Sequence, residues 1–206
     1  MRRLLLALLV LAGALALLVR PGEPQAAPPP GKLASAVFAG GCFWCTEADF
    51  DKIPGVVSTV SGYAGGRVAN PSYEQVSAGG TGHIESVRVV YDPAKVSYQT
   101  LVARFFRTVD PLDGGGQFCD RGSQYRTAIF VAQAAERRVA EATKARAAAL
   151  LKKPIATLIL PAGPFYPAET YHQDYYRKNP VPYRYYRYRC GRDARLAQVW
   201  GKSAGH

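Results

Sequence analysis

The sequence has 206 residues, of which 48% are hydrophobic and 20% are charged, and this composition indicates one ordinary globular domain with a sizeable core. A domain of this size does not need disulfide staples, and its four cysteines are few for a disulfide scaffold. The formal net charge of +11 arises largely from arginines that alternate with tyrosines in residues 176–195; because arginine over tyrosine is common surface packing and an exported protein seldom meets nucleic acid, we expect no nucleic-acid partner.

Residues 1–30 have the pattern of an export signal, or of an N-terminal membrane anchor, followed by a linker. A basic start, Met1-Arg2-Arg3, precedes an apolar run at residues 4–19 and a stretch rich in proline and alanine. Cleavage would fall near residues 26–27, although a neat Ala-x-Ala site is missing, and the apolar run is marginal for a membrane span of ~20 residues. We therefore expect a periplasmic or otherwise exported protein, cleaved or anchored to the inner membrane by residues 4–19, with a single domain at residues 31–206.

Strands and helices alternate through the rest of the chain. A strand is expected at residues 34–39, and a helix at 44–52 ends before the breaker pair Pro54-Gly55. The further elements expected in chain order are strands at 56–64 and 84–91, a helix at 97–107 capped by Ser97, a strand at 125–132, a helix at 134–151 and a strand at 155–160. Long glycine-rich loops fill residues 67–82 and 110–124.

The order strand, helix, strand, strand, helix, strand is the split βαβ pattern of a ferredoxin-like fold. We therefore expect an α/β protein with a two-layer α+β arrangement and a βαββαβ core. The C-terminal tail is expected to be rich in loops, with one short helix near residues 169–176. In this fold, Cys42 lies at the junction of the first strand and the first helix, where the glycine-rich loops can gather around it.

Residues 41–47, Gly-Cys-Phe-Trp-Cys-Thr-Glu, are the most informative segment. Cys42 stands where a helix begins, and the positive end of the helix dipole favours a thiolate over a thiol. Phe43 and Trp44 give this sulfur an apolar wall, which suggests chemistry on a small, partly apolar group. The spacing of Cys42 and Cys45 by itself suits a redox pair, a metal site or two inert buried thiols.

Five other segments accompany this motif, and each is weak when taken separately. A lone His83 is more often structural, a lone Glu85 on an alternating strand is more often solvated, and Asp120 could be a turn residue. The six segments are Gly-Cys-Phe-Trp at 41–44, Gly-Tyr-Ala-Gly-Gly at 62–66, Thr-Gly-His-Ile-Glu-Ser at 81–86, Cys-Asp-Arg-Gly-Ser-Gln-Tyr-Arg at 119–126, Tyr-His-Gln-Asp-Tyr at 171–175 and Lys-Asn-Pro at 178–180. Together and in this order, over about residues 33 to 200, they resemble the peptide methionine sulfoxide reductase A family.

This resemblance implies that the domain at residues 31–206 is catalytic and reduces the S-epimer of methionine sulfoxide, free or within proteins, to methionine. The Cys42 thiolate would attack the sulfoxide sulfur and end as a sulfenic acid. Glu85 would donate a proton to the departing oxygen, for which it needs a raised pKa.

The other site residues implied by the resemblance surround the sulfoxide group. Tyr63 and Tyr125 would donate hydrogen bonds to its oxygen, and Asp120 would assist through the polar network. Phe43 and Trp44 would hold the terminal methyl group of the substrate. No metal or organic cofactor is implied, and we expect a monomer.

The thiol that resolves the sulfenic acid is open, because the sequence departs here from well-known members of the family. The cysteine common after Lys-Asn-Pro-x-x-Tyr is replaced by Arg184, and a cysteine follows only at Cys190. Cys45 occupies a position that is usually glycine. We favour Cys190, in a mobile tail, as the resolving thiol, then Cys45, then Cys119, because a sulfenic acid condenses with whichever thiol reaches it. A relay through two of them, and final reduction by a thioredoxin-like donor, complete the expected cycle.

Two other classes of function fit parts of the sequence. A general thiol-disulfide oxidoreductase would use Cys42 and Cys45, but it would not explain Tyr63, Glu85 or Tyr125. A structural zinc site would use all four cysteines, although only one pair has metal-ligand spacing.

Overall fold

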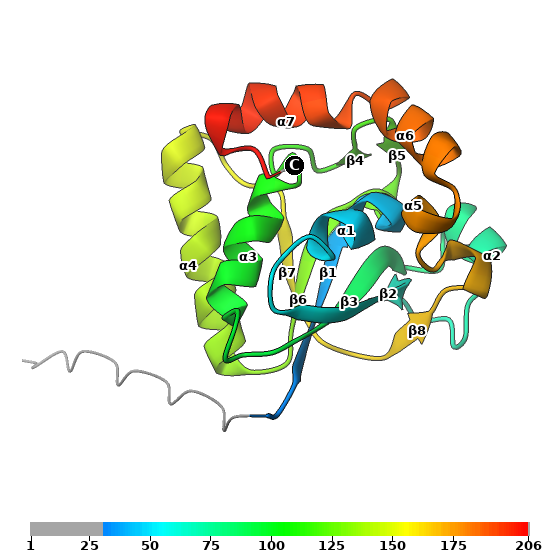
Figure 1. Cartoon of the computed structure of the whole chain (residues 1–206), viewed down its shortest axis with the longest axis horizontal. Coiled ribbons are helices and arrows are strands. Elements are labelled where there is room, and N and C mark those ends of the chain that lie inside the picture. The colour runs from blue at the N-terminus through cyan, green and yellow to red at the C-terminus, as the bar shows by residue number, and fades with distance from the viewer. Residues whose placement is uncertain (1–30, 206) are drawn as a thin grey trace, which may run out of the picture.

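The computed structural model describes residues 31–205, so the export signal or anchor expected at residues 1–30 lies outside the described part of the chain. One sheet forms the centre of the molecule (Figure 1). Its strands are β1 (Ala34–Gly40), β2 (Val56–Ala64), β3 (Ile84–Tyr91), β6 (Thr127–Val131), β7 (Leu158–Pro161) and β8 (Phe165–Pro167). They lie in the order β7-β6-β1-β3-β2-β8.

The four central strands confirm the ferredoxin-like core. Strands β6, β1, β3 and β2 pair only antiparallel with one another, and their order is the one that the split βαβ pattern requires. Strand β7 extends one edge parallel to β6, and β8 extends the other edge antiparallel to β2. The register pairs Tyr63 of β2 with Glu85 of β3.

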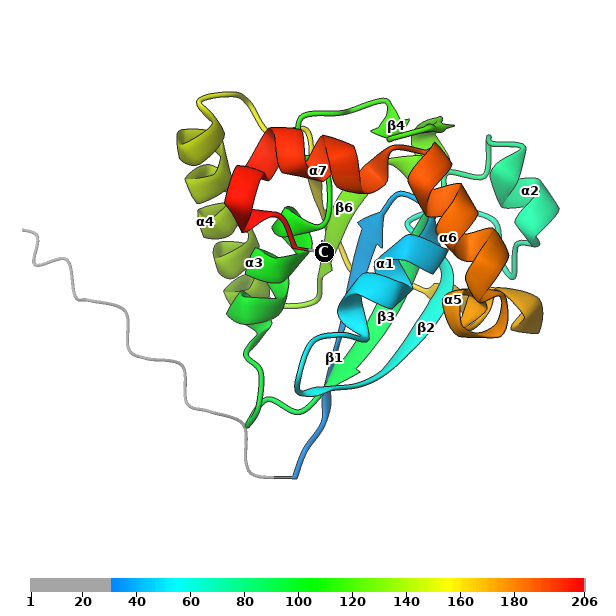
Figure 2. The same ribbon diagram turned by 45° about the horizontal axis from the view of Figure 1, so that its top comes forward.

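Helices α1 (Phe43–Phe50), α3 (Tyr98–Arg107) and α4 (Ala134–Leu151) form the second layer (Figures 1 and 2). The main core lies between this layer and the sheet. It contains buried aromatic side chains such as Phe38, Phe50 and Phe105, whose rings contact one another. As expected, Ser97 caps α3, and its side chain accepts a hydrogen bond from the Thr100 amide at 3.1 Å.

The C-terminal tail is helical, and the expectation of a loop-rich tail is wrong. It contains α5 (Tyr175–Lys178), α6 (Pro180–Arg189) and α7 (Arg192–Trp200). Proline at the first position of α6 suits a helix start, because it has no amide hydrogen to leave unpaired. Helices α6 and α7 cross over the α1 side of the molecule (Figure 2), and α7 is anchored there by buried Leu196 and Trp200.

The glycine-rich loops also contain short elements that we did not expect. Helix α2 (Tyr73–Ser77) begins with a reciprocal cap in which Ser72 and Gln75 each bond the other's amide. The second loop contains a small hairpin of β4 (Gly116–Gln117) and β5 (Asp120–Arg121), followed by a single 3₁₀ turn at Ser123–Tyr125. Helix α2 brings Tyr73, and the 3₁₀ turn brings Tyr125, toward the start of α1.

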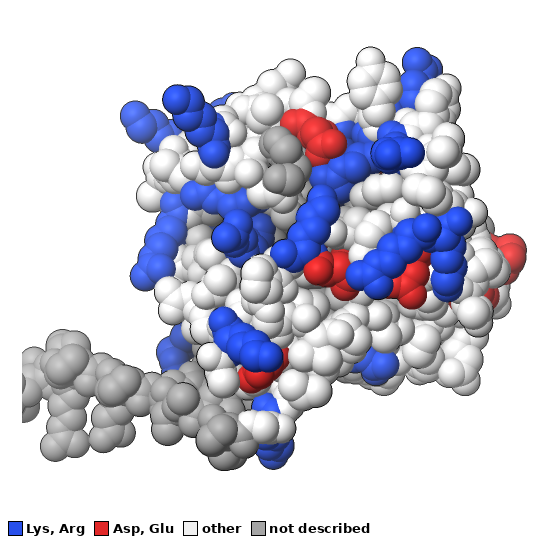
Figure 3. Space-filling model, viewed as in Figure 1, with Lys and Arg blue, Asp and Glu red and all other residues white. Residues whose placement is uncertain are grey.

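Lysine and arginine outnumber acidic residues on the face that Figure 3 shows. Some arginines of the described part of the chain form ion pairs: Arg195 pairs with Asp110 at 2.7 Å, and Arg177 pairs with Asp51 at 3.0 Å. Within residues 31–205, no helix is both long enough and apolar enough to cross a membrane.

Candidate active site

Cys42 is the N-cap residue of α1, directly after β1. Its carbonyl accepts hydrogen bonds from the amides of Cys45 and Thr46, both at 3.2 Å, which fixes the first turn of the helix. Gly41 precedes it with φ of +83°, and a Cβ there would lie 2.5 Å from Cβ of Gln117. Only glycine therefore fits at the turn that carries the chain from β1 into α1.

The two thiols of residues 42–45 are free, buried and within hydrogen-bond reach of each other. Burial raises the pKa of Cys42, and the neighbouring Cys45 and Glu85 raise it further. This direction is opposite to the effect of the helix dipole considered from the sequence. The hydrogen bond from Cys42 lowers the pKa of Cys45, and the nearby guanidinium groups of Arg192 and Arg187 add to this effect. In this pair Cys42 is therefore the hydrogen-bond donor and Cys45 the acceptor.

Glu85, the second residue of β3, faces the start of α1. Its side chain is 2% exposed, and its Oε2 accepts a hydrogen bond from the Phe43 amide at 3.0 Å. Burial raises the pKa of Glu85 to about 8. At neutral pH this carboxyl group is protonated, as a proton donor must be.

The aromatic residues that follow Cys42 differ in exposure. Phe43 is buried at 1% exposure, whereas Trp44 is partly exposed. Trp44 stacks on Tyr175 with ring centroids 3.8 Å apart, and its Nε1 donates to Nδ1 of His172 at 3.0 Å.

His172 is a residue that the sequence reasoning did not select. Burial lowers the pKa of His172, so the ring is neutral at pH 7. Because Nδ1 accepts the hydrogen bond from Trp44, Nε2 carries the proton. This buried Nε2 has no hydrogen-bond partner among residues 31–205. A buried donor without a partner beside an aromatic pocket is available to a substrate.

The tyrosines of the site are arranged differently from the sequence-based assignment. The Tyr63 hydroxyl is fully buried and donates to Oε2 of Glu169 at 2.8 Å. Tyr125 does lie among the reacting groups, since burial raises its pKa and Glu85 and Cys42 raise it further. Tyr73 of α2 lies there as well, because the same two groups act on its pKa after burial, raising it to about 12. Tyr73 was not selected from the sequence; the Ser72-x-x-Gln75 cap was the available signal that a helix starts there.

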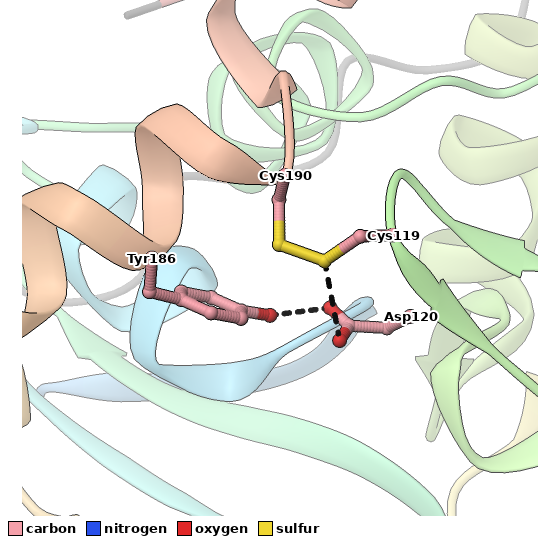
Figure 4. The surroundings of a disulfide bond; sticks show 4 residues. All are labelled: Cys119, Asp120, Tyr186 and Cys190. Carbon is pink, nitrogen blue, oxygen red and sulfur yellow. Dashed lines mark hydrogen bonds between the residues drawn. A yellow bond between two sulfur atoms is a disulfide. The ribbon is translucent and has the colours of Figure 1, made fainter.

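Asp120 lies between a disulfide and Tyr186 (Figure 4). The Tyr186 hydroxyl, from α6, donates to the Asp120 carboxylate. Burial raises the pKa of Asp120, while the hydrogen bond from Tyr186 opposes this effect. From the sequence, Tyr186 was one of several tyrosines in a basic tail.

Cys190 is not in a mobile loop but caps the end of α6, where it is joined to Cys119 by a disulfide with Cα atoms 4.8 Å apart. The structure therefore pairs Cys190 with Cys119 and leaves Cys42 as a free thiol. The four-cysteine zinc site considered from the sequence is not the arrangement found, because two of its sulfurs are bonded to each other.

A buried ionic cluster joins α1 to the basic C-terminal tail, and the sequence did not predict it. Arg187 and Arg192 contact the two oxygens of Asp49 at 2.9 and 3.5 Å. Arg192 is 2% exposed and also donates to the carbonyl groups of Gly40 and Thr108. These arginines tie α6 and α7 to α1 beside Cys45.

Comparison with known proteins gives one consistent result. The family model described as peptide methionine sulfoxide reductase matches residues 34–204. The chain is 52% identical over 202 residues to peptide methionine sulfoxide reductase MsrA 2 of Caulobacter vibrioides, covering 98% of this chain and all of that protein.

The fold of this chain is similar to that of yeast Mxr1 in solved structures. The reduced form of Mxr1 from Saccharomyces cerevisiae matches with a TM-score of 0.70 and 34% identity, over 74% of this chain and 88% of that one. Mxr1 in complex with Trx2 matches with a TM-score of 0.51 and 25% identity, over 71% of this chain and 86% of that one.

Proposed function

Because this chain belongs to the peptide methionine sulfoxide reductase A family, we propose that Cys42 is the nucleophile with which it reduces methionine S-sulfoxide to methionine. The observation that supports this most directly is the position of Cys42 at the start of α1, beside a carboxyl group, Glu85, that is protonated at neutral pH. The enzyme acts on free and protein-bound sulfoxide, and it repairs proteins after oxidation.

In the first step, the Cys42 sulfur attacks the sulfoxide sulfur while Glu85 gives its proton to the oxygen. Expelling oxide without a proton would be prohibitively unfavourable, so a neutral carboxyl group is the appropriate donor. Methionine leaves and Cys42 becomes a sulfenic acid. Tyr125 and Tyr73 are the hydroxyl donors placed to bind the oxygen, and Phe43 and Trp44 form the apolar side of the pocket. Tyr63 we now assign to positioning, because its hydroxyl is held by Glu169.

In the second step, a thiol displaces water from the sulfenic acid and forms a disulfide. Cys45 is the candidate that this arrangement favours, because its free thiol lies close enough to Cys42 for each to shift the pKa of the other, whereas Cys190 is bonded to Cys119. The guanidinium groups near Cys45 lower its pKa and so increase its thiolate fraction. A thioredoxin-like dithiol then reduces the disulfide, by analogy with Mxr1 in its complex with Trx2. The sum is methionine sulfoxide plus two thiols giving methionine, a disulfide and water.

The test of this function compares three variants. Cys42→Ser is expected to lose all reduction of the S-sulfoxide; turnover in this variant would contradict the assignment. Cys45→Ser is expected to keep the first turnover and lose multiple turnover with thioredoxin. Cys190→Ser is expected to keep multiple turnover, with a first turnover that is slower because the disulfide to Cys119 is lost. Reversal of the last two results would return the resolving role to Cys190, and reduction of insulin without sulfoxide reduction would favour a general oxidoreductase.

Export of this protein is part of the same proposal. The basic and apolar pattern of residues 1–30 supports it, and in that compartment the donor must deliver electrons across the inner membrane. Cell fractionation of the full chain, with mass determination of the mature N-terminus, tests export and cleavage together. Recovery of the intact chain in the cytosol would contradict export. We also propose a monomer, which sedimentation of the purified protein tests.

A further inference from the structure

Tyr186 connects the proposed nucleophile to a carboxylate. Its hydroxyl donates to the Asp120 carboxylate, as Figure 4 shows, and it lies close enough to the Cys42 thiol to lower the pKa of that thiol. Helix α6 brings Tyr186 over the start of α1, where its ring also meets Trp44 edge-on with centroids 5.7 Å apart. A continuous path of polar groups therefore runs from Cys42 to Asp120.

The first step requires such a path, because the nucleophile is buried as a thiol and must lose its proton. Burial raises the pKa of Cys42, and the adjacent Glu85 is already protonated at neutral pH, so Glu85 cannot take this proton. As the sulfur–sulfur bond forms, the thiol proton becomes more acidic, and a carboxylate then suffices as a base. Burial raises the pKa of Asp120, which makes the protonated form of this carboxyl group easier to reach.

We propose that Tyr186 is a catalytic residue that passes the proton of the Cys42 thiol to the Asp120 carboxylate as Cys42 attacks the sulfoxide. The S–H bond of Cys42 breaks and its proton binds the Tyr186 oxygen. The hydroxyl proton of Tyr186 moves to Asp120 at the same time. The electron pair left on the Cys42 sulfur forms the bond to the sulfoxide sulfur, and no electron leaves the site. This inference rests on the proposed role of Cys42.

The Cys119–Cys190 disulfide holds the two ends of this path together. Asp120 follows Cys119 directly, and Cys190 lies one helical turn after Tyr186, with its amide donating to the Tyr186 carbonyl at 2.9 Å. The disulfide therefore closes a small ring through the Tyr186 to Asp120 hydrogen bond. Its role in this inference is positioning, and it is separate from any part in recycling.

Several ionisable groups besides Tyr186 act on Cys42, and one of them is a rival base. They are Cys45 of α1, Glu85 of β3, Tyr73 of α2 and Tyr125 of the 3₁₀ turn; on Asp120 the charge of Arg192 also acts. Cys45 lies close enough to the Cys42 thiol to shift its pKa, and it could take the same proton. The hydrogen bond from Cys42 lowers the pKa of Cys45, and the Cys45→Ser variant separates this alternative from the path through Tyr186.

The experiment measures a single turnover without reductant, together with the pH midpoint of iodoacetamide alkylation at Cys42 located by tandem mass spectrometry. Tyr186→Phe is expected to slow methionine release by roughly 10²-fold and to move the alkylation midpoint upward. Asp120→Asn is expected to slow it similarly, and the double variant no further, because both lie on one path. Tyr188→Phe, on the exposed side of the same helix, is the matched control and should match the unmodified enzyme.

Each outcome decides the proposal. The proposal would be overturned if Tyr186→Phe left both the single-turnover rate and the alkylation midpoint of Cys42 unchanged. It would also be overturned if Cys45→Ser lost the first turnover while Tyr186→Phe kept it at the normal rate, because Cys45 would then be the base. Cys119→Ser/Cys190→Ser should slow the single turnover severalfold, since no recycling is needed in that assay; an unchanged rate would overturn the positioning role of the disulfide. Activity in Cys42→Ser would instead contradict the proposed function itself, so the two failures are distinguishable.

Discussion

At the scale of single residues, the site places opposite requirements on two neighbouring groups. In the proposed mechanism, Cys42 must become an anion to attack, and Glu85 must remain neutral to donate. The same burial serves Glu85 and opposes Cys42, because removal from water raises both pKa values. A partner that accepts the Cys42 proton, without charging Glu85, resolves this conflict, and Tyr186 with Asp120 occupies that position.

The stability of the protein should depend on pH through Glu85. Its folded pKa of about 8 lies above the value of 4.5 for the exposed side chain, so the folded state binds more protons between these values. The free energy of unfolding should therefore fall as the pH rises from about 4.5 to about 8. Glu85→Gln should reduce this fall and be the more stable form at pH 8, by on the order of a few kcal/mol, while its single-turnover rate drops. Some of the fall should remain, because burial also raises the pKa of Glu47 to about 7.

Urea denaturation of both forms across this pH range checks the prediction. The amide of glutamine retains an acceptor for the Phe43 amide, so the variant isolates ionisation. Equal slopes of stability against pH in the two proteins would contradict the raised pKa.

Residues whose proposed chemistry is visible from their type and spacing could be selected from the sequence, and residues whose proposed role depends on burial could not. Cys42 and Glu85 stand in specific short motifs. Tyr186 and His172 depend on helices crossing over α1, and no local pattern distinguishes Tyr186 from its neighbours Tyr185 and Tyr188. Only the tertiary packing makes one of these hydroxyl groups functional.

At the scale of elements, the turn between β1 and α1 is the most demanding part of the backbone. Gly41→Ala should destabilise the fold more than Gly79→Ala, although both glycines have φ of +83°. Alanine in this conformation costs roughly 1–2 kcal/mol at either position. At Gly41 the new Cβ also meets Gln117 at 2.5 Å, whereas at Gly79 it meets nothing within 4 Å.

Guanidinium chloride denaturation of the two variants measures the difference. Overpacking should add about 1–3 kcal/mol at Gly41, and sulfoxide reduction should fall with it because Cys42 follows directly. Equal losses of stability at the two positions would show that the contact with Gln117 relaxes freely.

The long regular elements were predictable and the C-terminal helices were not, for a physical reason. Helix α4 and strands β2 and β3 have the predicted limits, because their apolar spacing or composition is strong. Helices α6 and α7 carry buried arginines, Arg187 and Arg192, where a helix facing a core normally carries apolar residues. The ion pairs with Asp49 that make this burial possible are formed across more than 130 residues of sequence.

At the scale of the whole molecule, the last two helices are joined to the core by a covalent bond and by buried charge. Asp49→Asn should leave two buried guanidinium groups without their shared anion. Removing one partner of a buried ionic cluster costs about 3–5 kcal/mol. Thermal unfolding should therefore occur at a lower temperature than for Lys52→Gln, which removes only an exposed contact to the same carboxylate at 3.8 Å. Similar melting temperatures for the two variants would contradict the structural role of the cluster.

The Cys119–Cys190 disulfide should contribute a comparable amount to the free energy of unfolding. Cys119 and Cys190 are 71 residues apart, and the chain-entropy account of a loop of this length gives about 4 kcal/mol of stabilisation. Dithiothreitol should therefore lower the free energy of unfolding of the wild-type protein by up to this amount, and it should leave Cys119→Ser/Cys190→Ser unaffected. Denaturation of both proteins with and without the reductant measures this difference, and the double variant accounts for any effect of dithiothreitol on Cys42 and Cys45.

Because the same bond holds Asp120 against Tyr186, the loss of stability and the slower single turnover should appear at the same concentration of reductant. If stability and the single-turnover rate fell at different concentrations of dithiothreitol, the C-terminal helices would stay packed over α1 without the disulfide, held there by the ion pairs of Asp49 with Arg187 and Arg192.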